Sequence, residues 1–474
     1  MVKIWTAAAV AVVAALLSAG TAPTATFSQE DVTIVSADGT RLAATLFVPD
    51  GSPPAAGWPA VVFLHGLGGD RSSTIAIARL MGVVGQDYVV LAYDARGHGQ
   101  SGGLIGIDGP NEIVDVKAVF GWLAGRSDVA DGKIGAWGIS YGGGAAWNSL
   151  AAGVPWAAVE PVITWTNLEQ ALAPQRLAKT GVIAGFLSSL DPKRVDPEVF
   201  AIRDAAFSGS LVGVSGFSSA RSSAGTLHKM TTPVFMMQGR RDFAFGLDQV
   251  RTPWAKLKGP KRLWIGNHGH APSSFPAPDT PAMLVEGKRW FDRFLRGVPN
   301  GIDGPRRVVV AASASATVTR FTDLPRTTTA SFGFSAAGGK TIEASGKVVW
   351  RTSPTKTALE VFGAPTVKVD VRAAGGWSRL VAVLSARTPA GQEIVVSGGG
   401  VPLTTGRRTV TIRLIDQATF VPKGSRLTLT LASSSLAQNP GNLLYLDLPM
   451  PATARATIGP ATMKLPVLTR AISR

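Results

Sequence analysis

The stretch KIGAWGISYGGGAAW, residues 133–147, decides the fold that this sequence predicts. A short apolar run leads to Ser140, and a glycine-rich segment with helical character follows it directly. Gly138 and Gly142 flank Ser140 in the pattern G-x-S-x-G, which exposes a nucleophilic serine when it forms a sharp turn from strand to helix. The pattern alone is weak, because 54 glycines in 474 residues make a chance match common. Its meaning depends on the rest of the chain.

Short apolar runs that stop at glycine or a polar residue recur on both sides of this stretch, with helix-like segments between them. Continuous apolar runs of this length are typical of parallel strands that helices cover on both faces. We therefore predict an open α/β sheet over residues 27–300. The runs are PAVVFLHG (59–66), DYVVLAYDARGHG (87–99), WAAVEPVITW (156–165), TPVFMMQG (232–239) and KRLWIGN (261–267).

Two segments depart from this alternation. Between about residues 164 and 232 the pattern changes to helical stretches and a Ser/Gly/Ala-rich segment, which is too long for a plain connection and indicates an inserted helical cap. After Pro305 the runs TVKVDVR (366–372), TVTIRLI (409–415) and RLTLTLA (426–432) alternate apolar and polar residues. Period-two alternation is typical of half-buried antiparallel strands, so we predict an all-β sandwich over residues 305–474.

The N-terminus has the layout of a secretory signal. Lys3 precedes an apolar run over residues 4–17, and small residues follow it. We expect residues 1–26 to be removed and the mature protein to act outside the cytoplasm, with no membrane segment left after cleavage. An uncleaved anchor is the alternative. Because the chain has no cysteine, no disulfide supports the fold.

Composition excludes several classes of protein. Charged residues make up 16% and hydrophobic residues 45% of the chain, a balance typical of packed cores and not of disorder. The net charge is +16, but Lys and Arg are scattered in pairs at most, so we interpret them as a basic solvated surface and not as a nucleic-acid site. The pair His268–His270 offers only two nitrogens, which is too few for a zinc site. The glycines after His65 lack the lysine of a phosphate-binding loop.

Each part of a serine hydrolase site occurs at the end of a predicted strand, where an open α/β sheet binds its ligands. Ser140 is the candidate nucleophile. Asp242 follows the strand of residues 232–239 and is the candidate acid, with Asp248 as a substitute six residues on. His270, or less favourably His268, follows the last strand and is the candidate base.

The oxyanion would need two backbone donors. We predict the N–H groups of Leu67, in the glycine-rich turn after the strand of residues 59–66, and of Tyr141, directly after the nucleophile. We interpret His65 as a brace of the first loop and His98 as a member of a structured loop, while His228 lies in the predicted cap without an assigned role. No cofactor is needed for this chemistry.

Taken together, these motifs resemble the α/β-hydrolase superfamily. FLHGLGGD, YDARGHGQSGG, GAWGISYGGG, QGRRD and GNHGHA stand in that superfamily's usual order. More narrowly, GISYGG with a helical cap and a C-terminal sandwich resembles the X-Pro dipeptidyl-peptidase and cocaine-esterase-like group. The resemblance implies a jelly-roll sandwich that is not itself catalytic, and it implies Ser140 as nucleophile, Asp242 as acid, His270 as base and the Tyr141 N–H as an oxyanion donor.

The chain departs from the narrower group at one position. That group presents a tyrosine hydroxyl to the oxyanion from the loop after the early strand, whereas this chain has His65-Gly66-Leu67 there. We identify no acidic residue for a substrate's free amine. The sequence therefore predicts an exported serine hydrolase whose substrate is a small ester or a short peptide. A proline-directed dipeptidyl-peptidase is one alternative, and a non-catalytic protein that binds a glycan or wall polymer is another.

Overall fold

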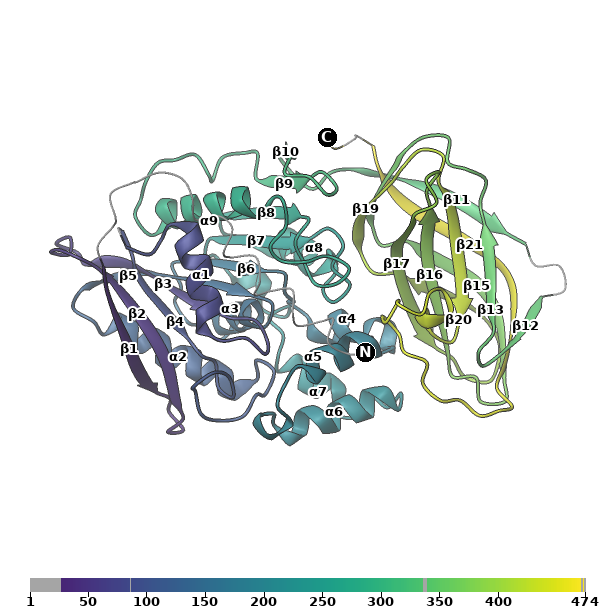
Figure 1. The fold of residues 1–474 in the computed structure, drawn as a ribbon, viewed down its shortest axis with the longest axis horizontal. Coiled ribbons are helices and arrows are strands. Elements are labelled where there is room, and N and C mark those ends of the chain that lie inside the picture. The colour runs from purple at the N-terminus through teal and green to yellow at the C-terminus, as the bar shows by residue number, and fades with distance from the viewer. Residues whose placement is uncertain (1–26, 86, 336–338, 470–471, 473–474) are drawn as a thin grey trace.

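The computed structural model describes residues 27–85, 87–335, 339–469 and 472. The signal segment predicted for residues 1–26 lies outside them. Figure 1 shows an α/β domain on one side, a cap of helices below it and an all-β domain on the other side. The predicted fold class, an α/β-hydrolase domain with a β-sandwich after it, is confirmed. In the described part of the chain, no helix is long and apolar enough to span a membrane.

The α/β domain is built on a ten-stranded sheet in the order β1-β2-β4-β3-β5-β6-β7-β8-β9-β10. Neighbouring strands from β4 to β9 are parallel. The antiparallel strands β1 and β2 form one edge of the sheet, and the antiparallel strand β10 forms the other. The central strands are buried on both faces, as their continuous apolar runs predict. The strands are β1 (Phe27–Val35), β2 (Arg41–Pro49), β3 (Trp58–Leu64), β4 (Val89–Tyr93), β5 (Val129–Ile139), β6 (Ala158–Val162), β7 (Val234–Gly239), β8 (Lys261–Gly266), β9 (Val308–Ala311) and β10 (Val318–Phe321).

Helices cover both faces of this sheet. Met81, Trp290 and Phe291, from the first and last helices of the domain, pack on one face, and Val116, Val119 and Ala146 pack on the other. The loops after β3, β5, β7 and β8 therefore meet at one edge, which is the carboxyl edge of the parallel strands. The helices are α1 (Arg71–Met81), α2 (Pro110–Ala124), α3 (Tyr141–Ala151), α8 (Asp248–Lys256) and α9 (Thr280–Phe294).

Helical segments fill the chain between β6 and β7, where the sequence predicts a cap. They lie below the α/β domain in Figure 1 and beside the sandwich. Side chains of this region and of the sandwich share one apolar cluster, which includes Leu190, Phe217 and Val381. The cap helices are α4 (Leu168–Leu172), α5 (Thr180–Ser188), α6 (Pro197–Phe207) and α7 (Val214–Ser219), with single 3₁₀ turns at Pro174–Arg176, Pro192–Arg194 and Leu227–Lys229.

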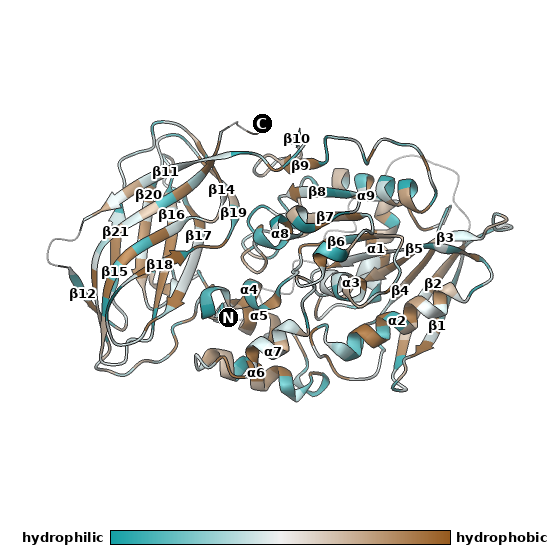
Figure 2. Ribbon diagram, turned by 180° about the vertical axis from the view of Figure 1, so that it is seen from behind, coloured by the Kyte–Doolittle hydropathy of each residue, from teal (hydrophilic) through white to brown (hydrophobic). Residues whose placement is uncertain are grey.

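The β-sandwich pairs a seven-stranded sheet with a four-stranded sheet, and its core consists of the inward side chains of both. Figure 2 shows mixed hydropathy along strands such as β15, in accord with their alternating burial. The first sheet has the order β18-β15-β21-β14-β19 with β11 and β12 paired to β21, and the second has the order β13-β20-β16-β17. The strands are β11 (Thr327–Phe334), β12 (Lys340–Glu343), β13 (Lys347–Arg351), β14 (Leu359–Gly363), β15 (Thr366–Ala374), β16 (Arg379–Arg387), β17 (Glu393–Pro402), β18 (Gly406–Arg413), β19 (Gln417–Val421), β20 (Arg426–Ala432) and β21 (Arg455–Leu468), with a 3₁₀ turn at Ser435–Ala437.

The domain boundary differs from the one expected at residue 305. Strands β9 and β10, which span residues 308–321, extend the sheet of the α/β domain, and the sandwich begins with β11 at Thr327. The run RVVVAA comes after a Pro/Gly linker and looks like the start of a new domain. Its valines are nevertheless fully buried, because β9 pairs in parallel with β8 and extends the sheet of the α/β domain.

Candidate active site

Ser140 lies at the junction of β5 and α3, in a backbone conformation that few residues adopt. Its φ of 54° and ψ of −112° lie outside the common regions, so the surrounding structure must hold it there. A Cβ at position 138 would overlap the Gly142 carbonyl, and a Cβ at position 142 would overlap the Leu64 carbonyl at the end of β3. The two glycines of G-x-S-x-G are therefore required sterically, and they allow the sharp turn that projects Ser140 from the sheet edge.

Three hydrogen bonds hold this turn. The Ser140 N–H donates to Val162 O over 2.8 Å, and the Ser140 carbonyl accepts from the Gly144 N–H over 3.0 Å and from the Thr164 hydroxyl over 2.7 Å. Tyr141 is the first residue of α3, so its N–H has no acceptor within the helix. That N–H lies at the positive end of the helix dipole, directly after Ser140.

The structure brings Ser140, His270 and Asp242 together from three different loops. Ser140 Oγ lies 2.9 Å from His270 Nε2, and His270 Nδ1 lies 2.7 Å from Asp242 Oδ2. A carboxylate only accepts hydrogen bonds, so Nδ1 carries the ring proton and Nε2 is left to accept from the serine hydroxyl. This geometry is that of a nucleophile, a general base and an orienting acid.

Asp242 is fully buried, yet its surroundings favour the ionised carboxylate. Burial raises the pKa of its carboxyl group, but the His270 ring and backbone N–H donors outweigh burial and lower the pKa below its ordinary value. Oδ1 accepts from the N–H groups of Ala244 and Phe245, each over 2.9 Å, and Oδ2 also accepts from the His270 N–H over 3.0 Å. The ionised carboxylate fixes the orientation of the ring and stabilises its protonated form.

His270 packs against aromatic rings on two sides. Its ring centroid lies 5.1 Å from that of Phe245 and 5.4 Å from that of Phe186 in α5, both in edge-to-face geometry. His268 lies elsewhere: it is fully buried, and its Nδ1 lies 3.7 Å from Asp279. Of the two histidines that the sequence offers, the structure places His270 at Ser140. Asp248, the substitute acid, lies in α8 and its carboxylate accepts from Gln249.

The loop after β3 lies against the serine. A Cβ on Gly66 would come within 3.8 Å of Ser140 Cβ, and Leu67 lines the same cavity as Ser140 and Tyr141. His65 is buried behind this loop, where Nδ1 lies 2.8 Å from Gly66 O and Nε2 accepts from the Ala95 N–H over 3.0 Å. Because burial lowers the pKa of His65, the ring is neutral and braces the loop. The N–H groups of Leu67 and Tyr141 remain the predicted oxyanion donors.

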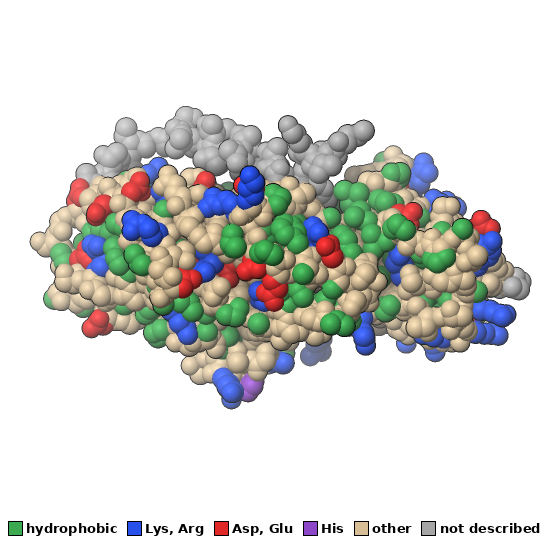
Figure 3. All heavy atoms as spheres, turned by 90° about the horizontal axis from the view of Figure 1, so that it is seen from below, with side chains coloured by type: hydrophobic (Ala, Val, Ile, Leu, Met, Phe, Trp, Pro, Cys, Tyr) green, Lys and Arg blue, Asp and Glu red, His purple; other side chains and the backbone are tan. Residues whose placement is uncertain are grey.

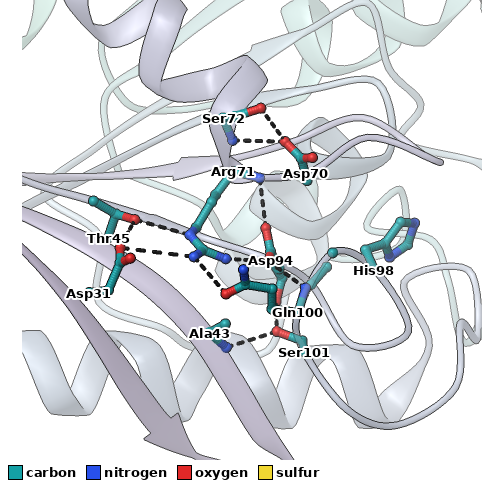
Figure 4. Close-up of polar contacts among 12 residues, drawn as sticks. Asp31, Ala43, Thr45, Asp70, Arg71, Ser72, Asp94, His98, Gln100 and Ser101 are labelled. Carbon is teal, nitrogen blue, oxygen red and sulfur yellow. Dashed lines mark hydrogen bonds and ion pairs between the residues drawn. The ribbon is translucent and has the colours of Figure 1, made fainter.

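His98 lies beside a polar network that is centred on Asp94. Asp94 accepts from the N–H groups of Arg71 and Gln100 over 2.7 Å and 2.8 Å and forms an ion pair with the Arg71 guanidinium (Figure 4). His98 is labelled beside this network, and its Nδ1 lies 3.0 Å from Arg96 O. Burial lowers the pKa of His98 to about 3, so it is neutral. These contacts fit a structural role, and the last histidine, His228, is exposed in the cap.

Sequence reasoning missed two residues that support the loop of residues 240–247, which carries Asp242 and is called the acid loop below. Lys179, fully buried before α5, donates to the carbonyls of Phe243 and Ala244 over 2.9 Å and 3.0 Å. Gln417, the first residue of β19 in the sandwich, donates to the Asp242 carbonyl over 2.7 Å. All three bonds join residues far apart in the chain, and no local pattern marks Lys179 or Gln417.

A cavity of about 860 Å³, counting the space at its mouth, opens onto Ser140. Cap side chains supply most of its wall, including Ile183, Phe186, Leu187, Ile202 and Phe217. Among the described residues that line it, only Glu169 and Arg203 are charged. The Arg203 guanidinium donates to Asp204 over 2.7 Å and lies over the Phe200 ring. The space beside the serine is therefore mostly apolar.

Comparisons with known proteins agree with this geometry. Residues 38–188 match the model of the X-Pro dipeptidyl-peptidase (S15 family), so the resemblance seen in the sequence is confirmed over that segment. The chain is also 34% identical over 133 residues to an uncharacterized protein of Mycobacterium tuberculosis (strain ATCC 25618 / H37Rv). That match covers 26% of this chain and 43% of the relative.

Two solved structures share the fold over nearly the whole chain. A CocE/NonD family hydrolase from Staphylococcus aureus matches with a TM-score of 0.73 at 15% identity and covers 94% of each chain. An alpha-amino acid ester hydrolase matches with a TM-score of 0.67 at 14% identity, and the match covers 95% of this chain and 98% of that protein. At such identities the likeness shows the fold alone. Together with the family match, it supports the prediction of a serine hydrolase.

Proposed function

We propose that this chain, which resembles X-Pro dipeptidyl-peptidases and cocaine-esterase-like hydrolases, is an exported serine hydrolase that cleaves small carboxylic esters through an acyl-enzyme on Ser140. The observation that carries the choice of an ester is the apolar cavity beside Ser140. Such a cavity favours an apolar acyl or alcohol group, because each buried methylene contributes about 0.8 kcal/mol. Apart from Glu169, it offers little to the charged amine of a short peptide.

The triad supplies both steps of the reaction. His270 Nε2 takes the proton of Ser140 as Oγ attacks the ester carbonyl carbon, and the carbonyl oxygen becomes an oxyanion facing the N–H groups of Leu67 and Tyr141. The carbon–oxygen bond to the alcohol then breaks, and His270 gives its proton to the departing oxygen. In the second step a water attacks the acyl carbon, His270 takes the water proton, and the acid leaves as Ser140 regains its hydrogen.

The second candidate is a dipeptidyl-peptidase, and one residue favours it. A free N-terminal amine needs a carboxylate in the site, and Glu169 is the one acidic side chain among the described residues that line the cavity. It is half-buried in α4, which the sequence alone does not associate with the site. If Glu169 bound an amine, Glu169→Gln would lower turnover of free-amine substrates and leave neutral esters unaffected.

A series of substrates tests the proposal. Purified residues 27–474 and the Ser140→Ala variant are assayed on nitrophenyl acetate, butyrate and hexanoate and on Ala-Pro nitroanilide with and without an N-terminal block. We expect ester turnover that requires Ser140 and a kcat/KM that rises about fourfold per methylene, the equivalent of 0.8 kcal/mol. Strong cleavage of the unblocked anilide alone would identify a peptidase instead.

A third candidate, an inert protein that binds a glycan or wall polymer, makes a different prediction. Such a protein would not react with a serine-directed fluorophosphonate, whereas an intact triad reacts and Ser140→Ala does not. Export is proposed from the sequence of residues 1–26 alone, which has one early lysine and an apolar run. Cell fractionation with N-terminal sequencing of the mature chain tests it, and recovery of uncut protein from the cytoplasm would refute it.

A further inference from the structure

The positive charge of this protein is concentrated in its β-sandwich. Residues 327–474 contain 17 Lys and Arg against 6 Asp and Glu, a net charge of +11, whereas residues 1–326 contain 30 against 25. The larger part of the chain is therefore nearly balanced, and the smaller part carries most of the total of +16. Figure 3 shows Lys and Arg side chains around the sandwich at the right-hand end of the molecule, with few acidic side chains among them.

The strand register gathers five of these cations on one face of the seven-stranded sheet. Lys368 and Arg372 are exposed on β15, between inward valines. Across the sheet, Arg407 of β18 pairs with Arg372, while Arg413 of β18 and Lys464 of β21 both pair with Thr366. Residues that pair directly point to the same face. We call Lys368, Arg372, Arg407, Arg413 and Lys464 the cationic face.

Hydroxyl groups lie between these cations, and acidic groups are few. Thr411 and Thr462 flank Lys368 in the register, and Thr457 lies beside Arg372. Asp370 is the one acidic residue among the outward positions of β15 and β18, and it accepts from the Thr409 hydroxyl. Ammonium, guanidinium and hydroxyl donors together suit the oxygens of anionic groups.

The composition of the face also limits its partner. The outward positions of β15 and β18 hold no aromatic ring, and stacking on such rings is what proteins use to hold single-stranded nucleic acid. The large hydrophobic side chains that are exposed in the described chain all lie before residue 327, so the face lacks the apolar anchors of a membrane-binding surface. Charge and hydroxyl donors are what the face presents.

We propose that the cationic face binds a polymer that has phosphate groups repeated along its backbone and carries no nucleobases. Outward side chains recur about every 6.8 Å along a strand, and neighbouring strands lie about 4.8 Å apart. The face is therefore a flat lattice of donors, and an extended polyanion contacts several of them at once. Each contact releases counterions from the polymer, so the binding is sensitive to salt. This surface lies in a different domain from the triad and does not depend on the proposed function.

The test compares two variants with the same loss of charge. The face variant is Lys368→Gln, Arg372→Gln, Arg407→Gln and Lys464→Gln. The control variant is Lys117→Gln, Lys133→Gln, Lys256→Gln and Lys258→Gln, all exposed cations of the α/β domain. Within the described chain none of the eight residues forms an ion pair, so neither set breaks one. The probe is long-chain inorganic polyphosphate, and its binding to the full mature protein is measured between 50 and 300 mM salt. Over this range the Debye length falls from about 14 Å to about 6 Å.

We expect the wild-type protein and the control variant to bind alike and the face variant to bind at least tenfold more weakly. The slope of log affinity against log salt should fall by about 3 in the face variant, at about 0.7 per phosphate contact. The circular dichroism spectrum and the urea unfolding transition should be alike in all three proteins, which shows that the variants are folded. Equal weakening in both variants would overturn the proposal, because only net charge would then matter. Tighter binding to poly-thymidylate or to anionic lipid vesicles would also overturn it, in favour of a nucleic acid or a membrane.

Discussion

At the scale of single residues, the most unusual group near the triad is the buried lysine. Burial lowers the pKa of Lys179 to about 8, against the opposing attraction of Asp248 and Asp242. Its ammonium group donates to the carbonyls of Phe243 and Ala244, the two residues that follow the acid. The carboxylate of Asp242 is in turn held by the N–H of Ala244. The two peptide groups that donate an N–H to Asp242 therefore accept from Lys179 through their carbonyl oxygens, so Lys179 supports the acid through these peptides.

The lowered pKa predicts a particular dependence of stability on pH. In the unfolded chain a lysine keeps its proton up to a pKa of about 10.4, whereas Lys179 in the folded protein releases it near 8. Between these values the unfolded state binds more protons, so the contribution of Lys179 to the free energy of unfolding rises with pH. Below pH 8 both states are protonated and the contribution is constant.

The comparison of wild type with Lys179→Met isolates this contribution. We expect the difference in the free energy of unfolding to rise in favour of wild type from pH 8 to 10, with a slope of up to about 1.4 kcal/mol per pH unit. Urea unfolding at half-unit steps from pH 7 to 10.5 measures it. A difference that stays constant over this range would show that Lys179 titrates normally.

At the scale of elements, α5 connects the sandwich to His270, the proposed base. Its N-terminus lies against the sandwich segment 443–446, because the Thr180 hydroxyl accepts from the Leu446 N–H over 2.8 Å and a Cβ at position 181 would overlap the Leu443 carbonyl. The same helix carries Phe186, which packs on the His270 ring and lines the cavity. The position of this helix therefore sets one wall of the site.

Gly181→Ala is expected to displace α5 from the sandwich. The added methyl group would overlap the backbone carbonyl of Leu443, so the helix must move, and Phe186 moves with it. We expect a lower melting temperature and a lower kcat on nitrophenyl butyrate. Gly216→Ala in α7 is the matched control, because a Cβ there meets nothing within 4 Å, and a helical alanine stabilises by about 0.5–1 kcal/mol. Equal behaviour of the two variants would contradict the importance of this contact.

The elements also show what the sequence can and cannot predict. The parallel strands, the period-two strands and the Ser140 turn were predictable, because each follows from local pattern and turn chemistry. The sequence places β9 and β10 in the sandwich, which is wrong, because a short valine run does not indicate which sheet it joins. Glu169, Lys179 and Gln417 were missed because their positions depend on contacts between distant segments, which no local pattern records.

At the scale of the whole molecule, the sandwich holds the loop that carries Asp242, the proposed acid. Gln417 donates to the Asp242 carbonyl over 2.7 Å, and the Ala418 N–H donates to Arg240 O over 2.7 Å. The Leu247 N–H donates to Asp416 O over 2.8 Å, and the Arg240 guanidinium forms an ion pair with Glu360 of β14. Both ends and the centre of the acid loop are thus bonded to the second domain, so the geometry of the triad depends on how the two domains pack.

Gln417→Leu tests this dependence. It leaves the buried Asp242 carbonyl without its donor, so we expect the acid loop to shift and kcat to fall roughly ten- to a hundredfold, with KM nearly unchanged because Gln417 does not line the cavity. Thr419→Val is the matched control: Thr419 is buried on the same strand, but its hydroxyl donates to Val396 O within the sandwich over 3.2 Å. Both variants should lose similar stability by urea unfolding, and only Gln417→Leu should lose kcat. If Thr419→Val lost as much kcat as Gln417→Leu, the effect would come from general destabilisation of the sandwich and not from its hold on the acid loop.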